Sequence, residues 1–202
     1  YAYHNTHYNP EFWKVPSQEM GLSDIEKIDH SMIRALNFAK TQYNEVSAYV
    51  KSIDSTKTIH IGETGWATVS SGHYGLNGSR ATDEYKQGQY YKHLREWTNK
   101  EGISCFYFEA FDEQWKAGTQ NPASHPEKNF GLINLVGEAK YLLWDMVDAG
   151  VVDDLQRGGL HIIKSYGAND VAMMYDVFAL PSAPAVNAPA SGQFLVLGVS
   201  ID

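Results

Sequence analysis

The sequence lacks most features that mark disulfide-rich, membrane-spanning and nucleic-acid-binding proteins. It has one cysteine, Cys105, which excludes an internal disulfide and a site of several thiolates, and we interpret it as a small buried residue. No apolar run approaches the roughly 20 residues of a membrane-spanning helix, so we expect no membrane insertion. Lysine and arginine total 16 against 24 acidic residues, and the net charge of −8 argues against nucleic acid as a partner.

The beginning of the chain also lacks expected features. It carries no recognisable signal peptide and no initial methionine, and it starts inside the alternating aromatic segment YAYHN. We therefore expect the natural protein to begin before Tyr1.

The sequence is rich in aromatic residues. They make up 13% of the chain, with 13 tyrosines and 5 tryptophans, beside an ordinary 43% of hydrophobic and 20% of charged residues. Rings in this number fill protein cores, and they also line carbohydrate-binding grooves, where flat rings stack on the apolar faces of sugars. Composition leaves both uses open.

Apolar periodicity alternates between strand-like and helix-like segments along most of the chain. The predicted elements are, in order, a strand at 1–6, a helix at 23–54, a strand at 58–62, a helix at 82–100, a strand at 103–111 and a helix at 139–149. Strands that alternate with helices of this length pair in parallel, so we expect an α/β fold.

Local residue patterns predict the ends of the helices. Ser23 and Glu26 have the spacing of a capping box at the start of the first helix, and Thr82 can cap the second. Gly102 separates the second helix from the next strand. Basic residues between 86 and 100 are interrupted by acidic ones, and we interpret them as a solvated helix face.

Residues 151–202 differ from the rest of the chain. They form short apolar segments, which we expect to add a short β-rich extension, and a Pro/Ala/Ser-rich stretch interrupts them. The sequence therefore predicts one domain over 1–180, a linker over 181–192, and the start of a further module or a tail over 193–202.

Polar and acidic side chains gather where the predicted strands end. These residues are His4 and Asn5 after the first strand, Glu63 after the second, and Glu109, Asp112 and Glu113 at the end of the third. In α/β barrels the carboxyl ends of parallel strands meet at one mouth, where active sites lie. We therefore expect Glu63 to point into such a mouth.

Three segments carry a resemblance to a known family. In this order, GETGW at 62–66, FEAFDEQWK at 108–116 and EKNFGLI at 127–133 resemble the signature segments of glycoside hydrolase family 17, the β-1,3-glucanases and their transglucosylating relatives. The resemblance covers roughly residues 1–180. It implies the C-terminal part of a (β/α)₈ TIM barrel, about its last three βα units.

The resemblance implies roles for the charged residues of these segments. Glu63 matches the catalytic nucleophile of a retaining glycosidase. Glu113 and Lys116 match the acidic and basic residues that line the glucose site. A Lys116 ammonium near the nucleophile would favour its ionised form.

The resemblance also implies a set of substrate-binding residues. Trp66 and Trp115 would be stacking platforms for glucose rings, and Glu109 would support the site through hydrogen bonds. A looser match places the first strand along the substrate cleft. The full set is Tyr1, Tyr3, His4, Trp66, Glu109, Phe111, Glu113, Trp115 and Lys116.

One catalytic residue of the family has no match in this chain. The family's acid/base is a glutamate that follows asparagine at the end of the fourth strand. The one Asn-Glu pair here, Asn44-Glu45, lies within the first predicted helix. We therefore expect the acid/base and about five βα units to lie in an N-terminal half of the same barrel, in the same chain or as a separate piece.

The activity that the resemblance implies is hydrolysis of laminarin-like β-1,3-glucan through a covalent glycosyl-enzyme on Glu63. Two alternatives stay open: a β-1,3-glucanosyltransferase, which passes the glycosyl group to a sugar, and a glucan-binding remnant without turnover. We expect no cofactor and no metal. A polysaccharide substrate implies a secreted, periplasmic or outer-surface protein.

Overall fold

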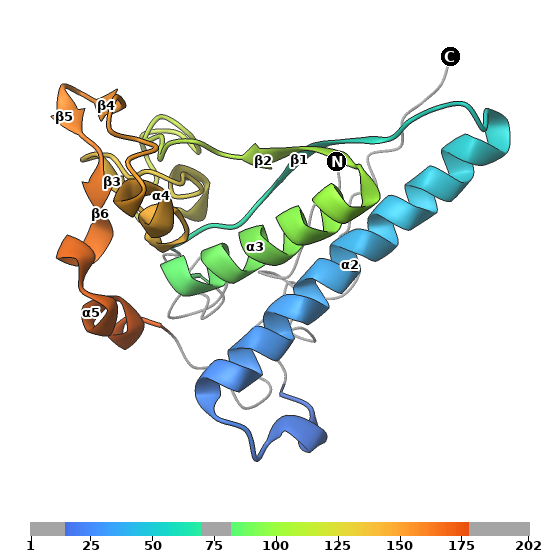
Figure 1. Cartoon of the computed structure of the whole chain (residues 1–202), viewed down its shortest axis with the longest axis horizontal. Helices are drawn as coiled ribbons and strands as arrows, with labels where there is room; N and C mark the ends of the chain where they lie inside the picture. Colours follow the sequence, from blue (N-terminus) through green and yellow to red (C-terminus); the bar gives the residue numbers. More distant parts are fainter. Residues whose placement is uncertain (1–14, 70–81, 178–202) are drawn as a thin grey trace.

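The computed structural model describes residues 15–69 and 82–177 (Figure 1). Some sequence predictions concern residues outside these ranges, namely the strand at 1–6 with Tyr1, Tyr3 and His4, the linker at 181–192 and the segment at 193–202. No helix within the described ranges is both long and apolar enough to cross a membrane.

Two long helices alternate along the chain with two parallel strands. The elements are α2 (Asp24–Ile53), β1 (His60–Gly65), α3 (Glu84–Glu101) and β2 (Ser104–Phe108). β1 and β2 pair in parallel, and α2 lies alongside α3, as Figure 1 shows. The mixed α/β character and the parallel pairing predicted from the sequence are therefore confirmed for this pair.

The main core joins the helices to the strand pair. Its buried residues come from α2, the end of β1, α3 and the C-terminal helices, and include Met32, Trp66, Tyr90, Leu94 and Trp144. A smaller cluster around Ile133 and Leu143 packs beneath the segment that follows β2.

Helix α2 begins and ends where the sequence predicts. The Ser23 hydroxyl accepts a hydrogen bond from the Glu26 amide, and the Glu26 carboxylate accepts from the Ser23 amide at 2.9 Å, which completes the capping box. Ile28, Met32 and Ala39 are buried at helical spacing against the core. Asp54 ends the helix.

Both strands differ in extent from the prediction. β1 continues to Gly65 instead of ending at 62, and β2 ends at Phe108 instead of 111. Pairing reaches Gly65 and Phe108, where the backbones approach so closely that a Cβ on Gly65 would lie 1.9 Å from the Phe108 carbonyl oxygen. Glu63 therefore lies inside β1 and not beyond its end.

Helix α3 corrects two predictions about its first turn. The cap is Asp83 and not Thr82, because the Asp83 carboxylate accepts the Lys86 amide at 2.8 Å. The Lys86 side chain is buried and pairs with the Asp83 carboxylate, so the predicted solvated face does not include it. At the other end Gly102 adopts φ 65°, a conformation that favours glycine.

The region after β2 is less helical than predicted. In place of one helix at 139–149, the chain forms β3 (Glu138–Ala139), the 3₁₀ turn η3 (Tyr141–Leu143) and α4 (Trp144–Asp148). The backbone is extended through Ala139, where it pairs with β6, and the next residue, Lys140, contacts Asp112 in a buried polar network.

The β-rich extension is confirmed in part. β6 (Ile163–Lys164) pairs in parallel with β3, and β4 (Gln156–Arg157) forms a hairpin with β5 (Leu160–His161). Residues 170–175, expected as part of the β-rich segment, instead form helix α5 (Asp170–Tyr175), which the Asn169 side chain caps. Short 3₁₀ turns complete the described chain: η1 (Ser17–Glu19), η2 (Pro126–Lys128) and η4 (Ser165–Ala168).

Candidate active site

Glu63 lies at a register shift in β1. The pairing with β2 is irregular between Ile61 and Thr64, and both of these residues are buried on the helix side. Thr64 contacts α3 directly, with its hydroxyl 2.8 Å from the Tyr90 hydroxyl. Gly62 and Glu63 are the two residues between, and both retain exposed surface. The irregular pairing therefore leaves Gly62 and Glu63 with exposed surface between two buried residues.

Lys116 lies between two carboxylates just beyond β2. Its ammonium group forms a very short contact with Glu109 Oε2 and lies 3.4 Å from Glu113 Oε2. The ammonium also lies over the Phe108 ring, 3.8 Å from its centroid. Among the described residues, the ion pairs of Lys116 are those with Glu109 and Glu113, and the predicted influence of its charge on Glu63 stays a prediction.

Glu109 is more deeply buried than Glu113. Its side chain is 13% exposed, against 35% for Glu113. Burial raises the pKa of the Glu109 carboxyl, the Lys116 ammonium opposes that shift, and the nearby Glu113 adds to it. Among the described residues, Glu109 Oε1 is buried without a hydrogen-bond partner.

The aromatic residues of the matched segments divide into exposed and buried ones. Trp115 is 71% exposed beside Lys116, and Phe111 is partly exposed with the Arg157 guanidinium 4.7 Å from its ring centroid. Trp66 has no exposed surface and packs 5.2 Å from the Tyr90 ring. The prediction of Trp66 as a stacking platform is therefore wrong, because a fully buried ring has no face to offer a sugar.

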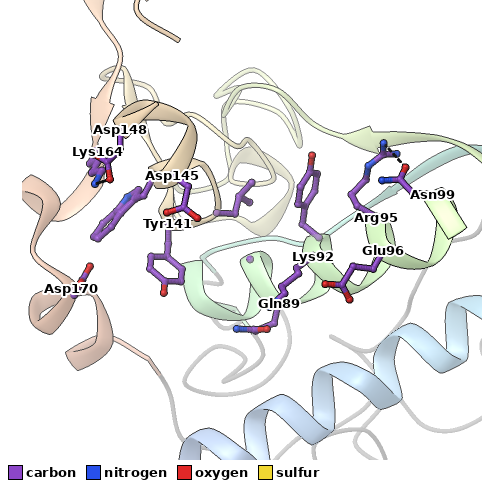
Figure 2. A pocket seen from close by; sticks show the side chains of 14 residues that line it. Gln89, Lys92, Arg95, Glu96, Asn99, Tyr141, Asp145, Asp148, Lys164 and Asp170 are labelled. Atoms are coloured by element: carbon purple, nitrogen blue, oxygen red, sulfur yellow. Dashed lines mark hydrogen bonds and ion pairs between the residues drawn. The ribbon is translucent and has the colours of Figure 1, made fainter. Parts of the chain in front are cut away.

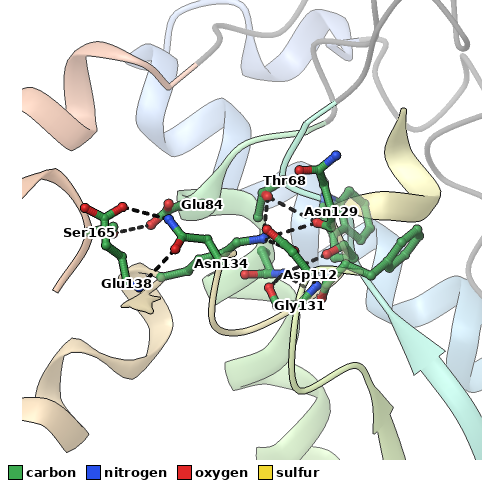
Figure 3. Close-up of polar contacts among 12 residues, drawn as sticks. Thr68, Glu84, Asp112, Asn129, Gly131, Asn134, Glu138 and Ser165 are labelled. Carbon is green, nitrogen blue, oxygen red and sulfur yellow. Dashed lines mark hydrogen bonds and ion pairs between the residues drawn. The ribbon is translucent and has the colours of Figure 1, made fainter. Parts of the chain in front are cut away.

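A buried ammonium group connects the segments that follow the two strands, as Figure 3 shows. Lys140 Nζ donates to Asp112 Oδ1 at 2.8 Å and to the Thr68 hydroxyl at 2.8 Å. It also lies 3.3 Å from the main-chain carbonyl of Asn129. The Asp112 carboxylate accepts in addition the Gly131 amide at 2.9 Å.

Burial acts on both members of the Asp112–Lys140 pair. It raises the pKa of the Asp112 carboxyl and lowers the pKa of the Lys140 ammonium, while their mutual attraction opposes both shifts. The sequence predicts Asp112 only as an acidic residue at the end of a strand, and no motif points to Lys140. The available signal was a lysine within the apolar segment EAKYLLW.

A second buried carboxylate lies at the start of α3, also drawn in Figure 3. Glu84 Oε2 accepts the Ser165 hydroxyl and the Tyr141 amide, both at 2.7 Å. Burial raises the pKa of Glu84, and these two hydrogen bonds oppose the shift. Ser165 also accepts the Trp144 indole N–H at 3.1 Å, so this cluster ties α3 to the C-terminal region. The sequence provided no pattern that identifies it.

The described residues also form a pocket on the outer side of α3, shown in Figure 2. It has a volume of about 640 Å³ and is lined by α3 residues such as Arg95 and by Tyr141, Asp145 and Lys164. None of the predicted site residues lines it. The pocket therefore lies apart from the candidate active site.

Comparison with solved structures finds a close similarity. The chain matches the crystal structure of an endo-laminarinase from Formosa Hel1_33_131 with a TM-score of 0.82 and 50% identity, over 89% of this chain and 46% of that one. A β-1,3-glucanosyltransferase of glycoside hydrolase family 17 from Rhizomucor miehei matches more weakly, with a TM-score of 0.36 and 20% identity over 53% of this chain and 33% of that one.

Comparison with curated proteins finds a glucan 1,3-beta-glucosidase of Saccharomyces cerevisiae. It is 29% identical over 147 residues, which are 65% of this chain and 45% of that protein. No protein-family model matches the chain. The chain thus spans less than half the length of the endo-laminarinase and of the yeast protein.

Proposed function

We propose that this chain is part of an enzyme of the glycoside hydrolase family 17 type, which hydrolyses β-1,3-glucan of the laminarin type. The observation that carries the proposal is the match to an endo-laminarinase, at 50% identity over 89% of this chain. At that identity a shared fold and a shared substrate class are the expected outcome.

The proposed fold is a (β/α)₈ barrel of which this chain is the C-terminal part. Two parallel strands with intervening helix α3 are compatible with two consecutive βα units of such a barrel. The N-terminal half would close the barrel and would supply the acid/base glutamate.

The proposed mechanism retains the anomeric configuration. Glu63 attacks the anomeric carbon and forms a covalent glycosyl-enzyme, while the acid/base protonates the departing oxygen and later activates water. In retaining enzymes the two carboxyl groups lie about 5–5.5 Å apart. The partial exposure of Glu63 within β1 supports this role, because a nucleophile must be accessible to the substrate.

The charged cluster after β2 would bind the sugar next to the bond that is cleaved. The partly exposed Glu113 carboxylate would accept hydrogen bonds from glucose hydroxyls, and Lys116 would hold it next to the more deeply placed Glu109. Trp115 would stack on a glucose ring through its exposed face. Phe111 would extend this apolar surface beside Arg157.

A β-1,3-glucanosyltransferase is the alternative within the same chemistry. It would form the same glycosyl-enzyme and release it to a sugar hydroxyl, so longer products would accompany shorter ones. Because the proposed substrate is a polysaccharide, we propose that either enzyme acts outside the cytoplasm, as a secreted, periplasmic or outer-surface protein.

The test is laminarin hydrolysis by the full-length protein and by its Glu63→Gln variant, with products separated by size. We expect turnover to fall by on the order of 1,000-fold or more in the variant, while laminarin binding is retained. NMR of the first products should show the retained β-anomer. Products longer than the substrate would favour the transferase.

The matched control is Glu45→Gln, which removes an exposed carboxylate on α2 from the chain's Asn-Glu pair. We expect this variant to hydrolyse laminarin like the parent. Equal hydrolysis by Glu63→Gln and the parent would refute the assignment of the nucleophile. Binding without hydrolysis by the parent would establish the glucan-binding remnant instead.

A further inference from the structure

We propose that Asp112 and Lys140 are positioning residues, which hold the segment after β1 and the segment after β2 in the relative placement that catalysis needs. This inference rests on the proposed function of the same site. It concerns two buried residues to which the sequence motifs assign no role and which do not themselves reach the substrate. Their side chains are 5% and 3% exposed.

The contacts of Lys140 gather three separate stretches of chain at one point. Its ammonium donates to Thr68, which follows β1, and to Asp112, which follows β2, both at 2.8 Å. Its third contact is the carbonyl of Asn129, at 3.3 Å. These partners lie 72, 28 and 11 residues from Lys140 in the sequence. One side chain thus joins three segments that are far apart in the sequence.

Each partner lies in a segment that is connected to the candidate site. Asp112 immediately precedes Glu113, and the Asp112 amide is fixed by the Ile133 carbonyl at 2.9 Å. Asn129 precedes Phe130, whose ring packs at 5.6 Å from the Phe108 ring beneath Lys116. Thr68 continues the segment that leaves β1 after Glu63. Thr68, Asp112, Asn129 and Lys140, together called the junction, therefore connect the segment after β1 with the segment after β2.

Further hydrogen bonds within the junction fix the orientation of the segments that meet there. The Thr68 amide and hydroxyl both donate to the Asn129 carbonyl, at 3.0 and 3.2 Å. The Gly131 amide donates to Asp112 Oδ1 at 2.9 Å. Hydrogen bonds fix distances and angles that apolar contacts leave adjustable.

A stabilising role alone is a weak explanation for this pair. Removing two charges from water costs several kcal/mol per ion, and apolar pairs of similar volume are often as stable or more stable. An apolar pair would lose the hydrogen bonds that hold the segments after β1 and β2 in one relative placement. A displacement of about 1 Å among catalytic groups can cost on the order of 100-fold in rate.

The test separates placement from stability with three variants of the full-length protein. Lys140→Met leaves the Asp112 carboxylate buried without its ammonium and should lower the urea midpoint strongly. Asp112→Asn with Lys140→Met removes both charges, keeps an acceptor for the Gly131 amide, and should recover much of that midpoint. Thr68→Val preserves shape and removes one arm of the junction.

We expect the double variant to hydrolyse laminarin with kcat lowered by about 10- to 100-fold and KM changed by less than about threefold. Thr68→Val should lower kcat in the same direction by a smaller factor while it stays folded. A double variant with recovered stability and the kcat of the parent would overturn the proposal. So would a Thr68→Val protein that is folded and fully active when the double variant does not fold.

A second readout does not depend on activity. Hydrogen–deuterium exchange of the backbone amides should rise in residues 66–69 and 109–116 of the double variant and stay unchanged in α2. Unchanged exchange in both segments would refute the positioning role even if the parent hydrolyses no laminarin. Lack of hydrolysis by the parent, with increased exchange in the variant, would instead refute only the proposed function.

Discussion

The amide of Gly131 lies 2.9 Å from the Asp112 carboxylate, and no side chain fits at residue 131. A Cβ there would lie 2.0 Å from the Asp112 nitrogen and 2.2 Å from the Phe111 carbonyl carbon. Because both of these are backbone atoms, a side chain cannot be accommodated without moving the segment that carries Phe111 and Asp112.

We therefore predict that Gly131→Ala destabilises the protein by about 1–3 kcal/mol or more, measured by urea unfolding. Laminarin hydrolysis should fall as well, because the displaced segment carries Glu113 and Lys116. The control is Gly62→Ala, where a Cβ meets nothing within 4 Å. Equal stability of the two variants would contradict the close packing at Gly131.

Two tryptophans of the matched segments should respond differently to truncation. Trp66→Ala should cost about 3–5 kcal/mol of unfolding free energy, because the indole is fully buried beside Tyr90. Trp115→Ala should change stability by less than about 0.5 kcal/mol. It should weaken binding of laminarin oligosaccharides by about tenfold, measured by calorimetry. Unchanged binding by Trp115→Ala would remove it from the proposed sugar site.

Glu84 should make stability fall with rising pH. Burial raises the pKa of this carboxyl above the 4.5 of an exposed glutamate, so the folded protein holds a proton where the unfolded chain has released it. The stability linked to that proton is present below about pH 4.5 and is lost as pH rises through the folded pKa. Glu84→Gln can accept the same two hydrogen bonds and carries no charge.

The measurement is urea unfolding of the parent and of Glu84→Gln between pH 4 and 7. The difference in unfolding free energy should shift in favour of the variant as pH rises. Glu101→Gln, at the exposed end of the same helix, is the matched control and should follow the parent. A difference that stays constant over this range would contradict the raised pKa of Glu84.

Cys105 should react slowly while the protein is folded. Burial raises the pKa of its thiol to about 11, from 9.0 for an exposed thiol, and the thiolate is the reactive form. At pH 8 we expect alkylation by iodoacetamide to be about 100-fold slower in native protein than in urea. As the chain has one cysteine, incorporated label reports this site alone. Equal rates in the two conditions would show that the thiol is accessible.

Several features of this protein could be predicted from short stretches of sequence. The capping box at Ser23 and the apolar spacing that follows it place α2 correctly, because caps and helical faces depend on residues three or four apart. The order of elements predicts the parallel pairing of β1 with β2, because a helix between two strands brings the second strand back in the same direction. The three motif segments predicted a similarity to β-1,3-glucanases, and the similarity to an endo-laminarinase and to a glucan 1,3-beta-glucosidase agrees with that prediction.

Other features depended on contacts between distant residues. Strict alternation along β1 would place Ile61 and Glu63 on the same face, and the bulge before Thr64 separates them. Tryptophan occurs in both GETGW and DEQWK, yet packing against Tyr90 buries Trp66 while Trp115 remains exposed. No local pattern distinguishes the two rings.

The sequence by itself determined helices α2 and α3, the order of β1 and β2, and the chemical character of the residues near each strand end, because these follow from spacing and composition within a few residues. Tertiary structure alone decided which of those residues are exposed and which are buried. Lys140 meets Thr68 across 72 residues and Asp112 across 28. Such a junction forms only when the whole chain folds, because the cost of burying its charges is offset by partners that local sequence does not supply.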